Sequence, residues 1–393
     1  MSARIPLFSL TLADDVRAAV TRVLDSNWLT MGPETQHFEA EFAALHGVQP
    51  EHTIAVNSCT AALHLALAAL RIGPGDEVIV PSLTFVATAN AVRYVGATPV
   101  FADVVGAHDL TMDVHHVAQL ITPKTKAVMP VHYAGYGVDM AALMAVCKPN
   151  GIAIVEDAAH APGVCTPLGA LGTIGDVGCF SFFSNKNVAI GEGGMLVCRD
   201  PALAQTLRLM RSHGMTHSTL DRDRGHAFSY DVIDTGFNYR IDELRSAIGR
   251  CQLTTLIADN DIRSEIVGLY RRLLADRAAG LGVVVPFTER DLNHSAYHIF
   301  PVVLPAGTKR QALMAYLRGR GIQTSIHYPP IHWFTDFRVG GEPVVQLPNT
   351  DDLAYRLMTL PLYPTMENEA VEEVVDALCA GLRARDLPSA EDR

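Results

Sequence analysis

The chain has 393 residues, of which 49% are hydrophobic and 19% charged. It is long enough for two domains with sizeable cores and should fold without stabilising disulfides or metals. Its net charge of -11, without a long basic tract, argues against nucleic acid as a partner. No apolar run approaches membrane-spanning length and the first residues lack the apolar core of a signal peptide, so we expect a cytoplasmic protein that does not bind membranes.

The cysteines give no sign of a metal site or a disulfide framework. The chain has seven of them, an odd number, and none forms a C-x-x-C pair. Several fall within apolar strands, where reduced thiols pack as small apolar groups. We therefore expect structural thiols and no bound metal.

Two amphipathic helices are predicted near the amino terminus. Residues 11–25 have apolar side chains at nearly helical spacing, with Asp14 and Asp15 in the predicted first turn. Residues 38–46 repeat the pattern, and Gly47 is a typical stop. The first of these helices opens the large domain.

A short strand and a buried helix follow. Residues 54–56 predict the strand, and residues 60–70 are almost wholly apolar, which is typical of a buried helix. The helix start, at Cys59, Thr60 and Ala61, could offer backbone N–H groups to a phosphate. A buried helix with a polar cap explains the same pattern nearly as well.

Strands then alternate with helices. The predicted strands lie at residues 78–81, 97–104, 127–132 and 152–157, with a helix at residues 140–146. Such alternation predicts an α/β fold with a mostly parallel sheet and right-handed crossovers.

Two segments carry residues that suggest chemistry. Asp157 ends an apolar strand, and in open α/β sheets the carboxyl ends of the strands hold the active site. Lys186 lies in a loop between strands predicted at residues 178–184 and 195–198. A strand-end aspartate followed by a loop lysine is the order expected if a pyridoxal phosphate ring lies between Asp157 and Lys186. The aspartate would pair with the protonated ring nitrogen, and the lysine would form the Schiff base. Taken singly, Lys186 could be a solvated charge and Asp157 a helix cap.

A basic segment begins about twenty residues after Lys186. Its members are Arg208, Arg211, His213, His217, Arg222, Arg224, His226 and Arg240. A charge run of this kind is usually a solvated loop. The alternative is a flexible loop that approaches an anionic substrate or the cofactor of a neighbouring subunit.

The last third of the chain predicts a smaller α+β domain. It contains one long helix or two joined ones at residues 242–270, helices at residues 309–318 and 371–382, and strands at residues 297–304 and 322–327. We place the large domain at residues 1–250 and the small domain at residues 251–393.

Motifs in the same order along most of the chain carry a family resemblance. They occupy residues 28–33, 57–64, 81–90, 131–135, 156–161, 180–194, 236–240 and 327–330. Together they resemble the sugar aminotransferases among the fold type I pyridoxal-phosphate enzymes, often called the DegT/StrS group.

This resemblance implies a set of roles. Lys186 and Asp157 would be catalytic, and Phe85 would stack on the pyridine ring, with His160 nearby. Cys59, Thr60, Ala61 and Ser181 would hold the phosphate. The family also implies a homodimer with shared active sites, in which Asn238 reaches the phosphate in the partner's site.

The expected activity is transfer of an amino group from glutamate or glutamine to a keto sugar, nucleotide-linked, in amino-sugar biosynthesis. A cyclitol ketone as acceptor and a non-catalytic regulatory protein with the same fold stay open as alternatives. A sugar dehydratase of the family would have histidine in place of Lys186. An amino-acid aminotransferase would need arginines for two carboxylates, and none can be assigned.

Overall fold

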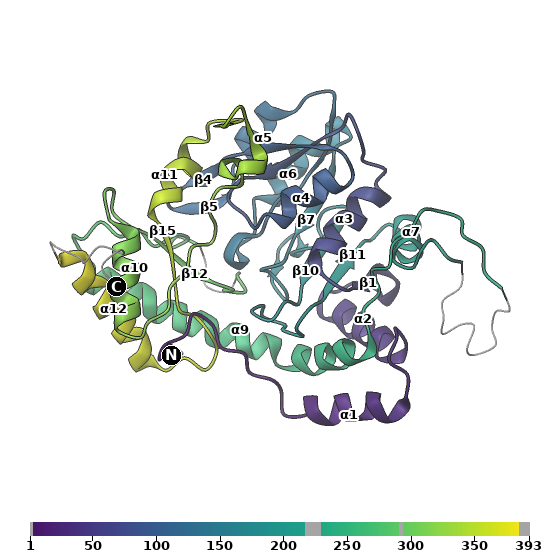
Figure 1. Cartoon of the computed structure of the whole chain (residues 1–393), viewed down its shortest axis with the longest axis horizontal. Coiled ribbons are helices and arrows are strands. Elements are labelled where there is room, and N and C mark those ends of the chain that lie inside the picture. Colours follow the sequence, from purple (N-terminus) through teal and green to yellow (C-terminus); the bar gives the residue numbers. More distant parts are fainter. Residues whose placement is uncertain (1–2, 217–228, 291–293, 385–393) are drawn as a thin grey trace.

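The centre of the protein is a sheet with helices on both faces, seen here in a computed structural model that describes residues 3–216, 229–290 and 294–384 (Figure 1). Within these residues the sheet has seven strands in the order β1-β11-β10-β7-β6-β2-β3. Their bounds are β1 Thr53–Val56, β2 Glu77–Pro81, β3 Thr98–Ala102, β6 Thr125–Val128, β7 Ala153–Asp157, β10 Val177–Ser181 and β11 Gly194–Val197. Among these seven strands β11 alone runs opposite to the other six, so the predicted α/β fold with a mostly parallel sheet is confirmed.

Alternate residues of the strands face opposite helix layers. In β2, Val78 and Val80 pack with one layer, whereas Ile79 between them packs with the other. The first layer holds α3 (Cys59–Ala69), α4 (Ala87–Tyr94) and α7 (Pro201–Arg211); the second holds α5 (Val114–Leu120) and α6 (Met140–Cys147). At the other end of the sheet, α2 (Pro33–Leu45) covers β10 and β11 through Phe38 and Phe42.

A single long helix, α9 (Glu243–Arg277), connects the sheet domain to the carboxyl-terminal part. It packs against α1 (Val16–Ser26) and α2 near its start and against α12 (Asn368–Arg383) further along, and Figure 1 shows it running across the lower part of the molecule, above α1. The predicted long helix is therefore confirmed as one continuous element. The domain boundary predicted at residue 250 falls inside it and stays a prediction.

The carboxyl-terminal part pairs β12 (Phe300–Val303) with β15 (Leu357–Leu360) and covers them with α10 (Arg310–Gly319) and α12. Further elements include α11 (Pro348–Arg356) and the short strand pairs β4–β5 (Val104–Gly106, Asp109–Met112), β8–β9 (Cys165–Thr166, Gly169–Ala170) and β13–β14 (Arg338–Val339, Glu342–Pro343).

The strand predicted at residues 322–327 is wrong. Ile322 forms a bridge with Ile5, and Ser325 forms one with Thr359 of β15. Because the two residues pair with different segments, no continuous ladder forms between them.

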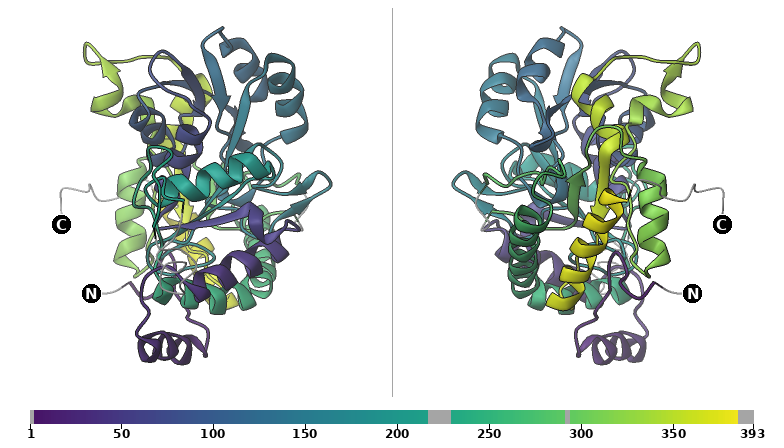
Figure 2. Two further views of the ribbon diagram at one scale, coloured as in Figure 1. Left: turned by 90° about the vertical axis from the view of Figure 1, so that its right-hand side faces the viewer. Right: turned by 90° about the vertical axis from the view of Figure 1, so that its left-hand side faces the viewer.

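The first helix begins later than predicted. α1 spans Val16–Ser26, so Asp14 and Asp15 precede it. Upstream, Ala13 N–H donates to Gln252 Oε1 at 2.9 Å, and Gln252 Nε2 donates to the carbonyl of Thr11 at 3.2 Å. These bonds to α9 hold the segment extended over the long helix. Both views in Figure 2 show α1 at the lower edge of the molecule.

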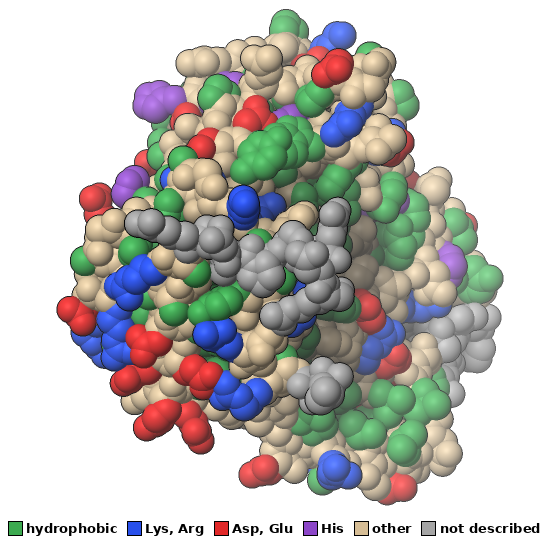
Figure 3. All heavy atoms as spheres, turned by 60° about the vertical axis from the view of Figure 1, so that its left-hand side comes forward, with side chains coloured by type: hydrophobic (Ala, Val, Ile, Leu, Met, Phe, Trp, Pro, Cys, Tyr) green, Lys and Arg blue, Asp and Glu red, His purple; other side chains and the backbone are tan. Residues whose placement is uncertain are grey.

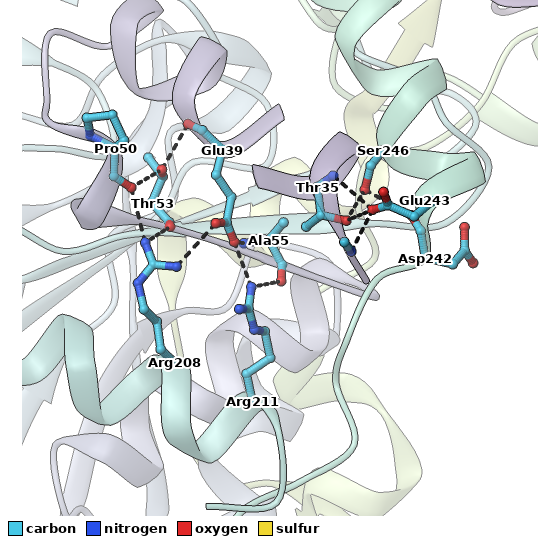
Figure 4. A network of polar contacts seen from close by, with 11 residues as sticks. Thr35, Glu39, Pro50, Thr53, Ala55, Arg208, Arg211, Asp242, Glu243 and Ser246 are labelled. Carbon is cyan, nitrogen blue, oxygen red and sulfur yellow. Dashed lines mark hydrogen bonds and ion pairs between the residues drawn. The ribbon is translucent and has the colours of Figure 1, made fainter. Parts of the chain in front are cut away.

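Two arginines of the predicted basic segment are structural. Arg211 Nη1 lies 2.6 Å from Glu39 Oε1 and Arg208 Nη1 lies 3.2 Å from Glu39 Oε2, so both reach one carboxylate of α2 (Figure 4). Glu39 also accepts from Ala55 N–H of β1 at 2.8 Å. These contacts fix α7 and α2 to the edge of the sheet. His217, Arg222, Arg224 and His226 lie outside the described residues.

Replacing Glu39 by alanine should lower the free energy of unfolding by about 3–5 kcal/mol, because it leaves Arg211 buried and without its carboxylate. Glu41→Ala in the same helix is the matched control. Glu41 pairs with Arg250 at the surface, where the side chains of Glu41 and Arg250 are 42% and 31% exposed. Loss of this ion pair should lower the free energy of unfolding by no more than about 1 kcal/mol. Urea unfolding of both variants tests this, and equal destabilisation would contradict the account.

The surface carries both signs of charge. Figure 3 shows acidic and basic side chains lying side by side on one face. All seven cysteines lie in the described residues, and all are free thiols. In that part of the chain, no helix is long and apolar enough to span a bilayer, and no cluster of histidine, cysteine and carboxylate side chains could hold a metal.

Candidate active site

One cavity of about 430 Å³ opens where the carboxyl ends of β2, β7 and β10 meet the start of α3. Several predicted site residues line it: Cys59, Thr60, Phe85, Asp157, His160, Ser181 and Lys186. This convergence follows from the fold, because the carboxyl ends of parallel strands meet at one edge of the sheet.

Asp157 supplies a buried carboxylate at the end of β7, with an exposed fraction of 5%. Thr88 Oγ1 donates to Oδ2 at 2.8 Å, and Ala159 N–H donates to Oδ1 at 3.2 Å. Burial raises the pKa of Asp157, while the two hydrogen bonds and the charge of Lys186 oppose this rise. The carboxylate thus faces the cavity with neutral donors around it, where a cationic group would stabilise its charge.

Lys186 lies in the loop after β10, and its Nζ lies 3.4 Å from Nε2 of His298. Burial lowers the pKa of Lys186 to about 8, although the Asp157 and Cys59 charges act in the opposite direction. At pH 7 about one molecule in ten then carries the neutral, nucleophilic amine, far more than for an exposed lysine.

The start of α3 borders the cavity through Cys59 and Thr60. N–H groups in the first turn of a helix lack intrahelical partners and attract anions. Ser58 caps the helix by accepting from Ala61 N–H at 3.1 Å, so the Ala61 amide is already engaged. A Cβ on Gly194 would lie 2.6 Å from the carbonyl carbon of Ser58, which explains the glycine in β11 beside this turn.

His160 lies on the wall of the cavity with 4% of its surface exposed. Its Nδ1 accepts from Ala134 N–H at 3.2 Å, so Nε2 carries the proton and donates to Tyr328 Oη at 3.1 Å. Burial lowers the pKa of His160 well below its ordinary value, which keeps the ring neutral. The ring of Phe85 lies 6.0 Å from that of Tyr328 at the open side.

Two predicted residues stay outside this cavity in the described part of the chain. Ala61 is buried and its N–H is bonded to Ser58, and Asn238 is exposed where its backbone pairs with Ser212. Asn57 Nδ2 contacts the carbonyl of Asn238 at 3.4 Å, so the Asn238 segment lies beside the end of β1.

A family model matches residues 11–379, namely that of the DegT/DnrJ/EryC1/StrS aminotransferase family. The chain belongs to this family. The aminotransferase is 40% identical over 365 residues to the spore coat polysaccharide biosynthesis protein SpsC of Bacillus subtilis, covering 91% of this chain and 92% of SpsC.

Solved structures agree with the family assignment. DesV of S. venezuelae is 36% identical to the aminotransferase with a TM-score of 0.87, covering 98% of this chain and 100% of DesV. The PLP-form of Spr1654 from Streptococcus pneumoniae is 26% identical to the aminotransferase with a TM-score of 0.86, and the match covers 97% of this chain and 99% of Spr1654. The predicted fold type I architecture and the predicted cofactor, pyridoxal 5′-phosphate, are confirmed.

The cavity of the aminotransferase suits this cofactor. The buried carboxylate of Asp157 and the weakly basic amine of Lys186 line the same space. A carboxylate can pair with the cofactor's ring nitrogen, and an amine can attach its aldehyde. The amino end of α3 lies at the border of that space, and helix N-termini of this kind attract anions such as phosphate.

Sequence reasoning missed several residues around the site. Thr88 lies one helical turn after Thr84, and that spacing could have pointed to it. Tyr328 lies in the motif at residues 327–330, whose composition alone does not assign it a role. His298 gave no local signal, because it reaches Lys186 from a segment 112 residues further along the chain.

Proposed function

We propose that this aminotransferase moves an amino group from glutamate or glutamine to the carbonyl of a nucleotide-linked keto sugar, in amino-sugar biosynthesis. The observation that carries the proposal is the cavity that holds Lys186 and Asp157 together. The relative SpsC supports a sugar acceptor, since its name assigns it to polysaccharide biosynthesis.

Pyridoxal phosphate, when bound, supplies an electron sink for the carbon that gains or loses the amino group. In our proposal Lys186 Nζ would hold the cofactor and, once displaced by the donor's amine, would move the proton between the substrate carbon and the cofactor's C4′. Its pKa of about 8 suits both tasks near neutral pH. Asp157 keeps the ring nitrogen protonated, and Thr88 fixes one oxygen of its carboxylate.

The other lining residues would position the cofactor. Phe85 would restrict the ring plane from the open side, where 58% of the residue's surface is exposed. Cys59 and Thr60 at the start of α3, with Ser181 at the end of β10, would bind the phosphate. His160 would support the ring from the wall, since its own polar atoms are engaged with Ala134 and Tyr328.

Two half-reactions test the proposal. The holoenzyme is first mixed with glutamate, glutamine or alanine, and conversion to the pyridoxamine form is followed by absorbance. That form is then offered nucleotide-linked keto sugars, free keto sugars and inositol ketones, and the products are read by mass. We expect glutamate or glutamine to be used and a nucleotide-linked keto sugar to be aminated. Turnover confined to inositol ketones, or no amino exchange at all, would contradict the proposal.

We further propose a homodimer in which Asn238 completes the partner's phosphate site, because Asn238 is exposed and lies outside the cavity of its own chain. A mixed dimer of Lys186→Ala and Asn238→Ala chains should then have one site with both changes and one with neither. We expect recovery of up to about half the wild-type activity in that dimer. The test requires that the Lys186→Ala homodimer and the Asn238→Ala homodimer each have clearly reduced activity. Mixed dimers no more active than the parents would mean that both residues serve one chain's site.

A further inference from the structure

The side-chain amide of Asn187, next to Lys186, has a fixed orientation. Its Nδ2 donates to the carbonyl of Ala296 at 2.7 Å and to Asn260 Oδ1 at 2.7 Å. Asn260 in turn uses its own Nδ2 to donate to the carbonyl of Pro162 at 3.2 Å, so its oxygen must face Asn187. A flipped Asn187 amide would place oxygen against two acceptors, and the structure therefore determines which atom is Oδ1.

This orientation determines the tautomer of His298. Asn187 Oδ1 lies 3.1 Å from His298 Nδ1 and can only accept, so Nδ1 carries the ring proton. Nε2 is then the atom with the lone pair, and it lies 3.4 Å from Lys186 Nζ. His298 is 5% exposed and its ring lies 4.3 Å from that of His160, which leaves little freedom to turn.

We propose that His298 is a positioning residue for Lys186, whose Nζ donates a hydrogen bond to the Nε2 lone pair and is held there facing the Asp157 side of the cavity. The proposal rests on the role of Lys186 in the proposed function. A lysine side chain has four rotatable bonds, and the hydrogen bond to His298 would hold its amine in one place against that rotamer freedom. The anchor is rigid because Asn260 belongs to α9.

Other ionisable groups also act on this pair, and the effect of His298 must be separated from theirs. Lys186 faces Asp157 and Cys59, while His298 faces His160, His327 and Arg263. Burial lowers the pKa of His298 well below its ordinary value, and Lys186 and these neighbours act in the same direction, so the ring stays neutral. A neutral acceptor stabilises the ammonium form of Lys186 more than the amine. Loss of the acceptor should therefore lower the pKa of Lys186 further.

The chain is well suited to a direct measurement of that pKa. It has five lysines, all in the described residues, and Lys124, Lys126, Lys148 and Lys309 are exposed. Cofactor-free protein is labelled with trace acetic anhydride across a range of pH, and acetylation of each lysine is quantified by peptide mass. The exposed lysines serve as internal standards. In the wild type, we expect Lys186 to titrate at about 8.

Three variants distinguish the loss of the hydrogen-bond acceptor from the loss of side-chain packing at His298. His298→Leu removes the acceptor and should lower the Lys186 midpoint by about one pH unit. His298→Gln can place Oε1 near the Nε2 position and should restore most of the wild-type midpoint. His46→Leu removes another buried histidine, bonded to Phe42 and Gly163 outside the cavity, and should leave the midpoint unchanged. Should His298→Leu not fold, His298→Asn replaces it, because the shorter side chain can bond Asn187 without reaching Lys186.

An unchanged Lys186 midpoint in His298→Leu or His298→Asn would overturn the proposal, as would an equal fall in His298→Gln. The measurement uses neither cofactor nor substrate, so its outcome is independent of the reaction. Failure to find the cofactor attached to Lys186 would refute the proposed function while leaving the midpoint shift in place. The two failures are thus distinguishable.

Discussion

Lys186→Ala should lose transamination by at least about 10³-fold, because in the proposed function Lys186 supplies both the amine that attaches the cofactor and the group that moves the proton. The variant should still fold, since Lys186 makes its polar contact at the cavity surface and not in a core cluster. Single-turnover conversion of bound cofactor by glutamate, followed by absorbance, measures the loss.

Lys309→Ala is the matched control for Lys186→Ala. Lys309 is exposed just before α10, outside the cavity, and its removal should leave turnover within about twofold of the wild type. Substantial transamination by folded Lys186→Ala would show that another group performs the proton transfer.

Asp157→Asn should slow turnover by about 10²–10³-fold with the fold intact. Asparagine has the shape of aspartate and keeps an oxygen for the bond from Thr88 Oγ1, but it carries no negative charge to hold a proton on the ring nitrogen. The loss should appear in the rate of proton removal from the donor, measured with deuterated glutamate, more than in donor binding.

Asp103→Asn controls for the loss of a buried aspartate. Asp103 is 6% exposed and accepts from Asn349 and Thr350 outside the cavity, so the variant should keep its turnover per folded molecule. Near-normal turnover by Asp157→Asn would mean that Asp157 only accepts the bonds from Thr88 and Ala159.

The strands and the convergence of Lys186 and Asp157 on one cavity could be predicted from the sequence because their causes are local. β7 is an apolar run that ends in a carboxylate, and the glycines after Lys186 separate two buried strands. The strand-helix alternation then implies a parallel sheet, whose carboxyl edge brings distant loops together. These steps depend on periodicity and chain order alone.

The features that the sequence did not predict depend on contacts between segments that are far apart in the chain. Arg208 and Arg211 resembled a solvated charge run, yet Glu39 of α2 pairs with both. The segment at residues 322–327 has strand composition, but no single partner strand lies along it. Nothing near His298 in the sequence shows that Asn187 fixes its tautomer from 111 residues away.

The most direct test of the central claim is the position of the covalently bound cofactor. Borohydride reduction of the holoenzyme makes the link between cofactor and lysine permanent, and peptide mass mapping then locates the pyridoxyl group. The five lysines of the chain make the assignment unambiguous. The account predicts one pyridoxyl group per chain on Lys186. A pyridoxyl group on Lys124, Lys126, Lys148 or Lys309, with Lys186 unmodified, would contradict it.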